Sequence, residues 1–116
     1  MKTVRMGLQP KYYDFLESGT KRIELRLYDE KRRAIEIGDV IEFAKSETEK
    51  LRAEVVGLLR YGSFRDLFED FPVEILADES MTKEELLRDL EEFYTPEKQA
   101  EFGVVGIRIK LLQNSR

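Results

Sequence analysis

The sequence predicts a small α+β domain, in which a curled or closed sheet of about five strands carries two or three helices at its openings. Three observations support this fold class. The chain has 116 residues, which is enough for one domain. A hydrophobic content of 41% with seven Phe and five Tyr supplies one core. Several segments alternate apolar and polar residues as antiparallel strands do, and helical patterns lie between them.

The N-terminal segments predict a strand followed by a helix. In residues 3–9, apolar side chains occupy every second position, which is the period of a half-buried strand. Residues 10–19 carry apolar side chains at helical spacing. Pro10 suits the first helical turn and Gly19 suits the C-terminal cap, so the chain is expected to leave this helix through a glycine turn.

The same strand-like alternation recurs twice in the following part of the chain. Residues 21–28 and residues 39–46 each place apolar side chains at every second position, which predicts two further strands. The segment between them is rich in charged residues and ends at Gly38, which predicts a polar connection.

The middle of the chain predicts a long strand and a short helix. The strand covers residues 51–62, where Gly57 interrupts the alternation. A glycine inside a strand often marks a bulge or a sharp bend, as at the corner of a barrel. Residues 63–71 predict a short helix, because Ser63 precedes an apolar stripe of helical spacing and can cap it.

The clearest helix in the chain covers residues 82–94. Thr82 and Glu85 have the spacing of a capping box, in which each side chain satisfies a backbone N–H of the first turn. Pro96 then opens another short helical piece. Residues 103–112 return to strict alternation, which predicts the closing strand.

No linker or repeat divides the chain, so we expect one domain over residues 1–112 and a frayed tail over residues 113–116. The N-terminal residues contain no apolar core of a secretion signal, and no apolar run approaches the length of a membrane helix. We therefore expect a cytoplasmic protein with no membrane partner.

Composition excludes several kinds of chemistry. The chain has no Cys and no His, which removes thiolate nucleophiles, zinc clusters and the usual general base. The acidic residues show no recognisable ligand spacing, so we expect no metal and no cofactor. The formal net charge of −4 argues against a protein that grips extended DNA, since such proteins need many phosphate-neutralising cations.

A basic stretch over residues 18–33 holds the candidate site. Ideal alternation places Lys21 on the face of Ile23, with Glu24 and Arg26 on the opposite face, so Lys21 and Glu24 meet only if the strand begins irregularly. One hypothesis is that Lys21, Glu24 and Arg26 line a pocket. The plainer interpretation is a solvated Lys beside a surface Glu–Arg ladder. The pattern alone favours the plainer one, because charged residues are mostly exposed.

Two further groups have a functional and a plainer interpretation. The run Lys31, Arg32 and Arg33 suits a phosphate, although such a run is more often a solvated loop. Tyr61 and Tyr94 can stack on a base of single-stranded RNA, although such tyrosines more often cover the core with the hydroxyl group outward.

The stretch SGTKRIELRLYDEKRRAIEIGDVIEF, residues 18–43, resembles the signature of the ASCH domain family. That signature combines a glycine turn, a Lys, a short strand of the Glu-x-Arg type and a Gly-Asp pair that opens the next strand. The matching residues are Gly19, Lys21, Glu24, Arg26, Gly38 and Asp39. The segment FYTPEKQAEFGVVGIRIKLL, residues 93–112, is similar to the end of small single-domain bacterial and archaeal members. The resemblance thus covers nearly the whole chain.

The resemblance implies a PUA-like fold, which is a small mixed β-barrel of five to six strands with helices around its openings. It also implies a cleft beside the first helix–strand turn that accepts RNA, a nucleotide or a nucleoside. Lys21, Glu24 and Arg26 would line this cleft, with Tyr61 or Tyr94 stacking on the base. The oligomeric state is left open.

The family also suggests an alternative in which the protein is an enzyme. Some small members are amidohydrolases that act on acetylated cytidine, with a catalytic Lys after the glycine turn, a Thr three residues later and a Glu before the long helix. Here Lys21 and Glu79 take the Lys and Glu positions, whereas Glu24 stands at the Thr position. A neighbouring carboxylate stabilises the Lys ammonium, which opposes its use as a nucleophile or base.

The sequence also leaves room for a ribonuclease and for a protein-interaction module. Ribonuclease-like activity, known for some relatives, would use a Lys, a Tyr and a Ser, for which this chain offers Lys21, Tyr61 and Ser63. In a protein-interaction module, the cleft would be vestigial.

Overall fold

The computed structural model of the protein describes residues 1–112, and the expected tail at residues 113–116 lies outside the described part. One sheet forms its centre, with the strand order β1-β3-β4-β5-β2. The strands are β1 (Thr3–Gly7), β2 (Ile23–Leu27), β3 (Val40–Ala44), β4 (Lys50–Tyr61) and β5 (Val104–Leu111). The expected α+β class with about five strands is confirmed for residues 1–112.

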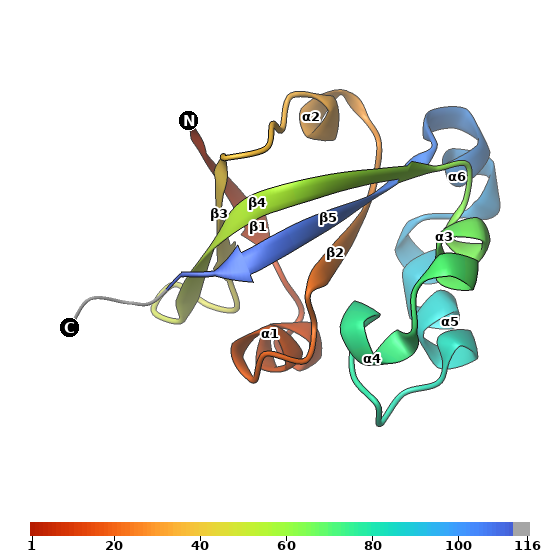
Figure 1. Ribbon diagram of the computed structural model, residues 1–116. Helices are drawn as coiled ribbons and strands as arrows, with labels where there is room; N and C mark the ends of the chain where they lie inside the picture. Colours follow the sequence, from red (N-terminus) through yellow and green to blue (C-terminus); the bar gives the residue numbers. More distant parts are fainter. Residues whose placement is uncertain (113–116) are drawn as a thin grey trace.

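The sheet is mixed and strongly curled. β1 runs parallel to β3, whereas the other neighbouring strands are antiparallel. β1 and β2 are the two edges, and the curl brings them near each other (Figure 1). The Nη2 atom of Arg26 on β2 donates to the carbonyl oxygen of Gly7 on β1 at 2.9 Å. A candidate site residue therefore bridges the open side of the half-barrel.

Six helical elements accompany the sheet within residues 1–112, which is more than the two or three that the sequence predicts. They are α1 (Pro10–Glu17), α2 (Glu30–Arg33), α3 (Phe64–Asp70), α4 (Val73–Leu76), α5 (Lys83–Phe93) and α6 (Pro96–Phe102). α2 and α4 are not expected from the sequence, because they are single turns of four residues and too short to show helical periodicity. α2 is held by Asp29, whose side chain accepts from the backbone N–H of Arg32.

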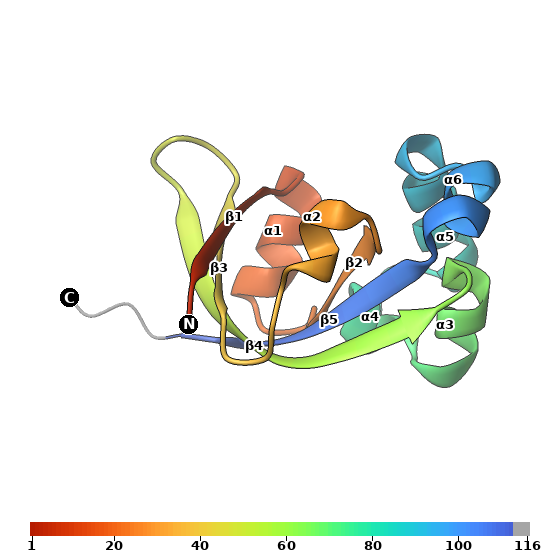
Figure 2. The same ribbon diagram turned by 90° about the horizontal axis from the view of Figure 1, so that it is seen from above.

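The helices divide the core into two parts. α1 and α2 lie at the two openings of the curled sheet, and α3–α6 gather at one end of the long β4–β5 ribbon (Figure 2). One apolar cluster fills the barrel interior between α1 and the strands, with Leu16, Phe43 and Ile107 among its members. A second cluster packs Ile23 and Leu25 of β2 against α3, α4 and α5. β5 contributes to both clusters, with Val104 in the second and Val105 and Ile107 in the first.

The expected irregularity at Gly57 is present. The register between β4 and β5 shifts between Val55 and Gly57, which is a β-bulge. A Cβ atom at Gly57 would lie 3.1 Å from Cδ of Arg108 on β5, so a larger residue there would require the Arg108 side chain to shift.

Candidate functional site

The turn after α1 places Lys21 at the entrance to β2. Gly19 has a φ of +88°, a conformation that glycine adopts readily. The next three residues then bind α4 in succession. The Thr20 hydroxyl donates to the carbonyl of Ala77 at 3.0 Å, Lys21 Nζ donates to that of Leu76 at 2.9 Å, and the Arg22 backbone N–H donates to that of Ile75 at 2.7 Å. β2 begins only at Ile23, so the irregular start that brings Lys21 to Glu24 is present.

Lys21, Glu24 and Arg26 form a buried charge cluster, which we call the buried triad. Lys21 and Glu24 are only 4% and 3% exposed. Lys21 Nζ lies 3.3 Å from Glu24 Oε1, and Arg26 Nε lies 2.6 Å from Glu24 Oε2. The plainer interpretation of a solvated surface ladder is therefore wrong. Two cations share one carboxylate, which leaves the buried triad with a net charge of +1.

Burial and mutual contact shift the pKa of each member of the buried triad. Burial alone raises the pKa of Glu24, but Arg26 and Lys21 outweigh this effect and lower that pKa below its ordinary value. Burial also lowers the pKa of Arg26, but Glu24 and Tyr94 raise it by more. Burial lowers the pKa of Lys21, Glu24 opposes this shift only in part, and the net result is a pKa below the ordinary value of a lysine.

The contacts of Lys21 decide what this side chain can do. A Lys ammonium has three N–H donors. Lys21 Nζ faces three acceptors, which are the carbonyl oxygen of Ile23 at 2.6 Å, that of Leu76 at 2.9 Å and Glu24 Oε1 at 3.3 Å. An ammonium has no lone pair, and engagement of all three N–H donors stabilises this form against the free amine that nucleophilic attack requires. The geometry is that of a fixed cation.

The opposite wall of the site comes from α5. The Tyr12 hydroxyl of α1 donates to Asp89 Oδ2 at 2.5 Å, and Lys11 Nζ donates to the same oxygen at 2.9 Å. The pKa of Asp89 is lowered by these two donors, so its carboxylate is charged at neutral pH. Burial and the hydrogen bond to Asp89 raise the pKa of Tyr12 above its ordinary value, so Tyr12 stays protonated.

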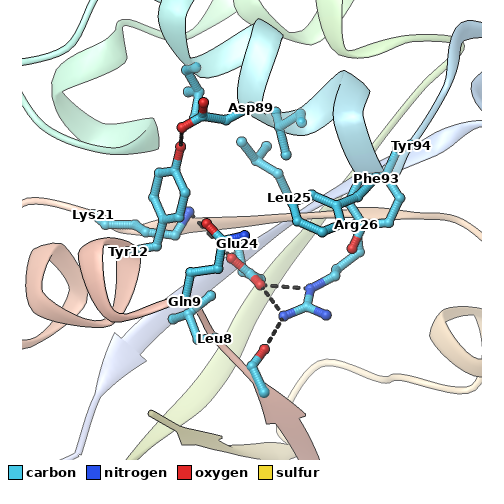
Figure 3. Close-up of a pocket in the computed structure, with 13 residues that line it drawn as sticks. Leu8, Gln9, Tyr12, Lys21, Glu24, Leu25, Arg26, Asp89, Phe93 and Tyr94 are labelled. Atoms are coloured by element: carbon cyan, nitrogen blue, oxygen red, sulfur yellow. Dashed lines mark hydrogen bonds and ion pairs between the residues drawn. The ribbon is translucent and has the colours of Figure 1, made fainter.

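These walls enclose a cavity of about 210 Å³, which we call the main cavity (Figure 3). The buried triad forms its charged floor. Leu25, Leu86 and Leu90 supply apolar sides, and Phe93 and Tyr94 supply aromatic ones. Phe93 is 55% exposed, so the face of its ring is accessible at the rim of the main cavity. The main cavity thus combines a net positive floor, apolar and aromatic walls, and one carboxylate.

The structure brings together four of the residues that the sequence singles out. Lys21, Glu24, Arg26 and Tyr94 all line the main cavity. Tyr61 does not, because its hydroxyl donates to Asp70 and its ring borders a separate hollow.

Glu79 and Ser63 also lie away from the main cavity. Glu79 is exposed in the connection between α4 and α5 and is not among the residues that line the cavity. Ser63 caps α3 by accepting from the backbone N–H of Asp66. Neither Glu79 of the amidohydrolase alternative nor Tyr61 and Ser63 of the ribonuclease alternative lines the main cavity with Lys21.

Asp89, Tyr12 and Phe93 belong to the site although the sequence does not single them out. A signal for Asp89 is present, because it lies three residues after Leu86 and four before Phe93 on one face of α5. A charged residue within an otherwise apolar helical face is a departure from pattern. The partner Tyr12 lies 77 residues away in the sequence, and no local pattern predicts this pairing.

In the described part of the chain, no helix is long and apolar enough to cross a membrane. The same residues contain no group of three or more His, Cys, Asp or Glu side chains placed to hold a metal ion.

Comparison with known families and structures identifies the relatives of the chain. The family model described as the ASCH domain matches residues 6–113. A crystal structure of the hypothetical protein PH0355 is 39% identical, with a TM-score of 0.85, and the match covers 97% of this chain and 100% of that one. The solution structure of protein PF0455 from Pyrococcus furiosus is 37% identical, with a TM-score of 0.77, and covers 97% and 99% of the two chains.

A more distant likeness concerns the fold alone. A crystal structure of a mutant ASCH protein from Zymomonas mobilis, ZmASCH S128A, has a TM-score of 0.62 at 15% identity, and the match covers 93% of this chain and 67% of that one. No curated protein matches the chain at a significant level.

Proposed function

This chain belongs to the ASCH domain family, and on that premise we propose that its main cavity binds the base of a nucleotide or of single-stranded RNA. The observation that carries the proposal is the buried triad, which sets a net positive charge beneath apolar and aromatic walls. A cavity of this composition suits a flat, polar ring that carries an anionic group.

The floor supports recognition of an anion or a carbonyl oxygen. Arg26 lies at the floor with its guanidinium oriented by Glu24 and by the carbonyl of Gly7, so little side-chain entropy is lost when a ligand binds. The surroundings are apolar, which strengthens the attraction of the uncompensated positive charge for a phosphate. Glu24 keeps this cation in place.

The walls support recognition of a base. Phe93 and Tyr94 offer ring faces for stacking, and an exposed aromatic side chain at a cavity rim is well suited to cover a bound base. Asp89 Oδ2 is occupied by Tyr12 and Lys11, whereas Oδ1 is the oxygen that can accept from an amino group on a ring. A ligand with an amino edge and a phosphate would use both ends of the cavity.

Hydrolysis of an amide on a modified nucleoside, such as acetylated cytidine, is the alternative. It receives less support, because the three N–H donors of Lys21 are engaged and Glu79 is exposed outside the main cavity. A vestigial cleft in a protein-interaction domain is the second alternative, and it predicts no binding of nucleotides at low salt.

The test is a calorimetric titration with nucleosides, nucleoside monophosphates and a short single-stranded RNA at low salt. Wild type should bind phosphate-bearing ligands, and its binding constant should fall as the salt concentration rises. In a plot of the logarithm of the binding constant against the logarithm of the salt concentration, each phosphate contact should contribute about −0.7 to the slope. Arg26→Gln should weaken binding by about tenfold, the usual effect of losing one charge-assisted hydrogen bond. Arg22→Gln is the matched control, since Arg22 is exposed on the same segment and makes the same charge change.

The enzyme alternative is tested in parallel by mass spectrometry of acetylated cytidine incubated with wild type, Lys21→Met and Glu79→Gln. Turnover that is lost in both variants would replace the binding proposal with the amidohydrolase. No binding by wild type at low salt would replace it with the interaction module.

A further inference from the structure

A second cluster of cations and aromatic rings lies just beyond the end of β2. The guanidinium carbon of Arg60 lies 4.3 Å from the centre of the Tyr28 ring, and that of Arg33 lies 5.4 Å from it. Arg33 Nε also donates to the carbonyl oxygen of Tyr28 at 3.2 Å. Within residues 1–112, neither guanidinium forms an ion pair with a carboxylate.

Both arginines of the cluster are exposed to solvent. Two like charges are held beside one ring without a counter-ion, although the protein carries 24 acidic and 20 basic side chains. The nearby Asp29 caps α2 by accepting from the backbone N–H of Arg32, and its carboxylate also pairs with the Arg32 guanidinium. With guanidinium carbons 4.3 Å and 5.4 Å from one ring centre, the two charges are at most about 10 Å apart, so an anion beside Tyr28 is attracted by both, which makes the cluster a candidate phosphate site.

Tyr28 and Arg60 of this cluster line a hollow of about 300 Å³, which we call the second hollow, and Arg33 lies beside it through its contact with Tyr28. Its lining residues include Tyr28, Arg60, Tyr61, Gly62 and Phe102. Three of these five are aromatic, and the hydrogen bond from the Tyr61 hydroxyl to Asp70 at 2.5 Å fixes one of the rings. Aromatic faces beside arginine are the usual surface for an unstacked base and its phosphate.

The second hollow lies close to the main cavity along β2. Arg26 lines the main cavity and Tyr28 lines the second hollow. The two residues are two positions apart, and the Tyr28 backbone N–H donates to the carbonyl oxygen of Gly103 at 2.9 Å, which continues the pairing of β2 toward β5. In extended backbone their Cα atoms are about 7 Å apart, which is close to the length of one nucleotide step.

We infer that the second hollow takes a neighbouring nucleotide of the same ligand, with its phosphate on Arg33 and Arg60 and its base against Tyr28 or Tyr61. The ligand is then a single-stranded polynucleotide and not a free nucleoside. This inference rests on the proposed function, because it assumes that one base occupies the main cavity. It also gives a role to Arg33 of the basic run and to Tyr61, neither of which lines the main cavity.

The test compares a nucleoside monophosphate with a single-stranded RNA of four nucleotides by calorimetry at several salt concentrations. The variant Arg33→Gln/Arg60→Gln should bind the tetranucleotide about tenfold more weakly than wild type, with a salt slope smaller by about one. Its affinity for the monophosphate should stay within about twofold of that of wild type, because the main cavity is untouched.

The matched control is Arg52→Gln/Lys110→Gln, which removes the same charge from two exposed residues on the same ribbon. Arg52 lies eight residues before Arg60 on β4, roughly 25 Å away at about 3.3 Å per residue. This control should leave both affinities within about twofold of wild type. If the control weakens binding of the tetranucleotide as much as Arg33→Gln/Arg60→Gln does, the effect of the cluster is one of overall charge and the inference is wrong.

The remaining outcomes separate this inference from the proposed function. If wild type binds the monophosphate but gains no affinity for the tetranucleotide, the proposed function stands and the second hollow is not a nucleotide site. If Arg33→Gln/Arg60→Gln weakens both ligands equally, the two hollows are one site and the inference is wrong. If wild type binds neither ligand, the proposed function and this inference fail together.

Discussion

The clearest energetic consequence of the buried triad is the effect of Glu24→Gln. This substitution keeps the shape of the side chain and removes the one carboxylate that neutralises both Lys21 and Arg26. The charge of the buried triad then rises from +1 to +2, and both cations lose their ionic partner in a site that is 3–4% exposed at Lys21 and Glu24. Removing one partner of a buried ion pair costs about 3–5 kcal/mol, so we expect the free energy of unfolding to fall by about that amount.

The measurement is urea unfolding followed by far-ultraviolet circular dichroism, together with thermal unfolding. For a domain of this size, 1 kcal/mol corresponds to about 4 °C in Tm, so Glu24→Gln should lower Tm by roughly 12–20 °C. Glu42→Gln is the matched control. Glu42 is also a strand residue, but its partner Arg5 is exposed and lies 3.7 Å away, so this substitution should cost about 0–1 kcal/mol.

The result that would refute this reasoning is a Glu24→Gln protein whose stability lies within about 1 kcal/mol of the wild type, like that of Glu42→Gln. Such a result would mean that water reaches the buried triad or that the carboxylate is dispensable to its cations. The net positive floor of the main cavity would then have no structural basis.

Individual residues give three further predictions. Phe93→Ala should weaken nucleotide binding by about 1–3 kcal/mol, as expected for the loss of a stacking ring. The free energy of unfolding should change by less than about 0.5 kcal/mol, because Phe93 is largely exposed. Equal losses of binding and of stability would show that Phe93 belongs to the core. The hydrogen bonds and charge of Lys2 lower the pKa of Asp39 to about 2 from an ordinary value of 3.8, so its contribution to stability is present above pH 3.8 and lost as the pH falls toward 2. Wild type should therefore lose more stability than Asp39→Asn between about pH 5 and pH 2 in urea titrations, and parallel curves would contradict this. Gly103→Ala should destabilise the protein by about 1–3 kcal/mol, because φ of Gly103 is +73° and a Cβ atom there would lie 3.3 Å from the carbonyl oxygen of Tyr61. An unchanged midpoint of urea unfolding would contradict this prediction and show that the turn can relax.

The sheet can be predicted well from the sequence, because alternation and glycine positions are local signals. The strands near Met6, Phe43 and Ile107 follow from apolar periodicity, and the bulge follows from Gly57. The capping box of Thr82 and Glu85 is also present as expected. The order of the strands and the parallel pairing of β1 with β3 depend on contacts between distant segments, which periodicity does not encode.

The candidate site can be predicted only in part. Gly19 and the charge pattern draw attention to Lys21, Glu24 and Arg26, but alternation alone favours their exposure. Their burial depends on α4 and α5, which cover the start of β2 from positions more than 50 residues later in the sequence. Asp89 cannot be predicted as a site residue for the same reason, since its place in the site depends on the hydrogen bond that it accepts from Tyr12, a residue distant in the sequence.

The most direct test of the binding site is to locate the ligand by two-dimensional ¹H–¹⁵N NMR, with a nucleoside monophosphate added to the labelled protein at low salt. We expect the largest shift changes at the backbone amides around the main cavity, among them those of Gly7, Leu25 and Leu90, and we expect Arg26→Gln to reduce them strongly. Changes confined to other surfaces, or changes that persist unaltered in Arg26→Gln, would contradict the assignment of the buried triad as the floor of a binding site.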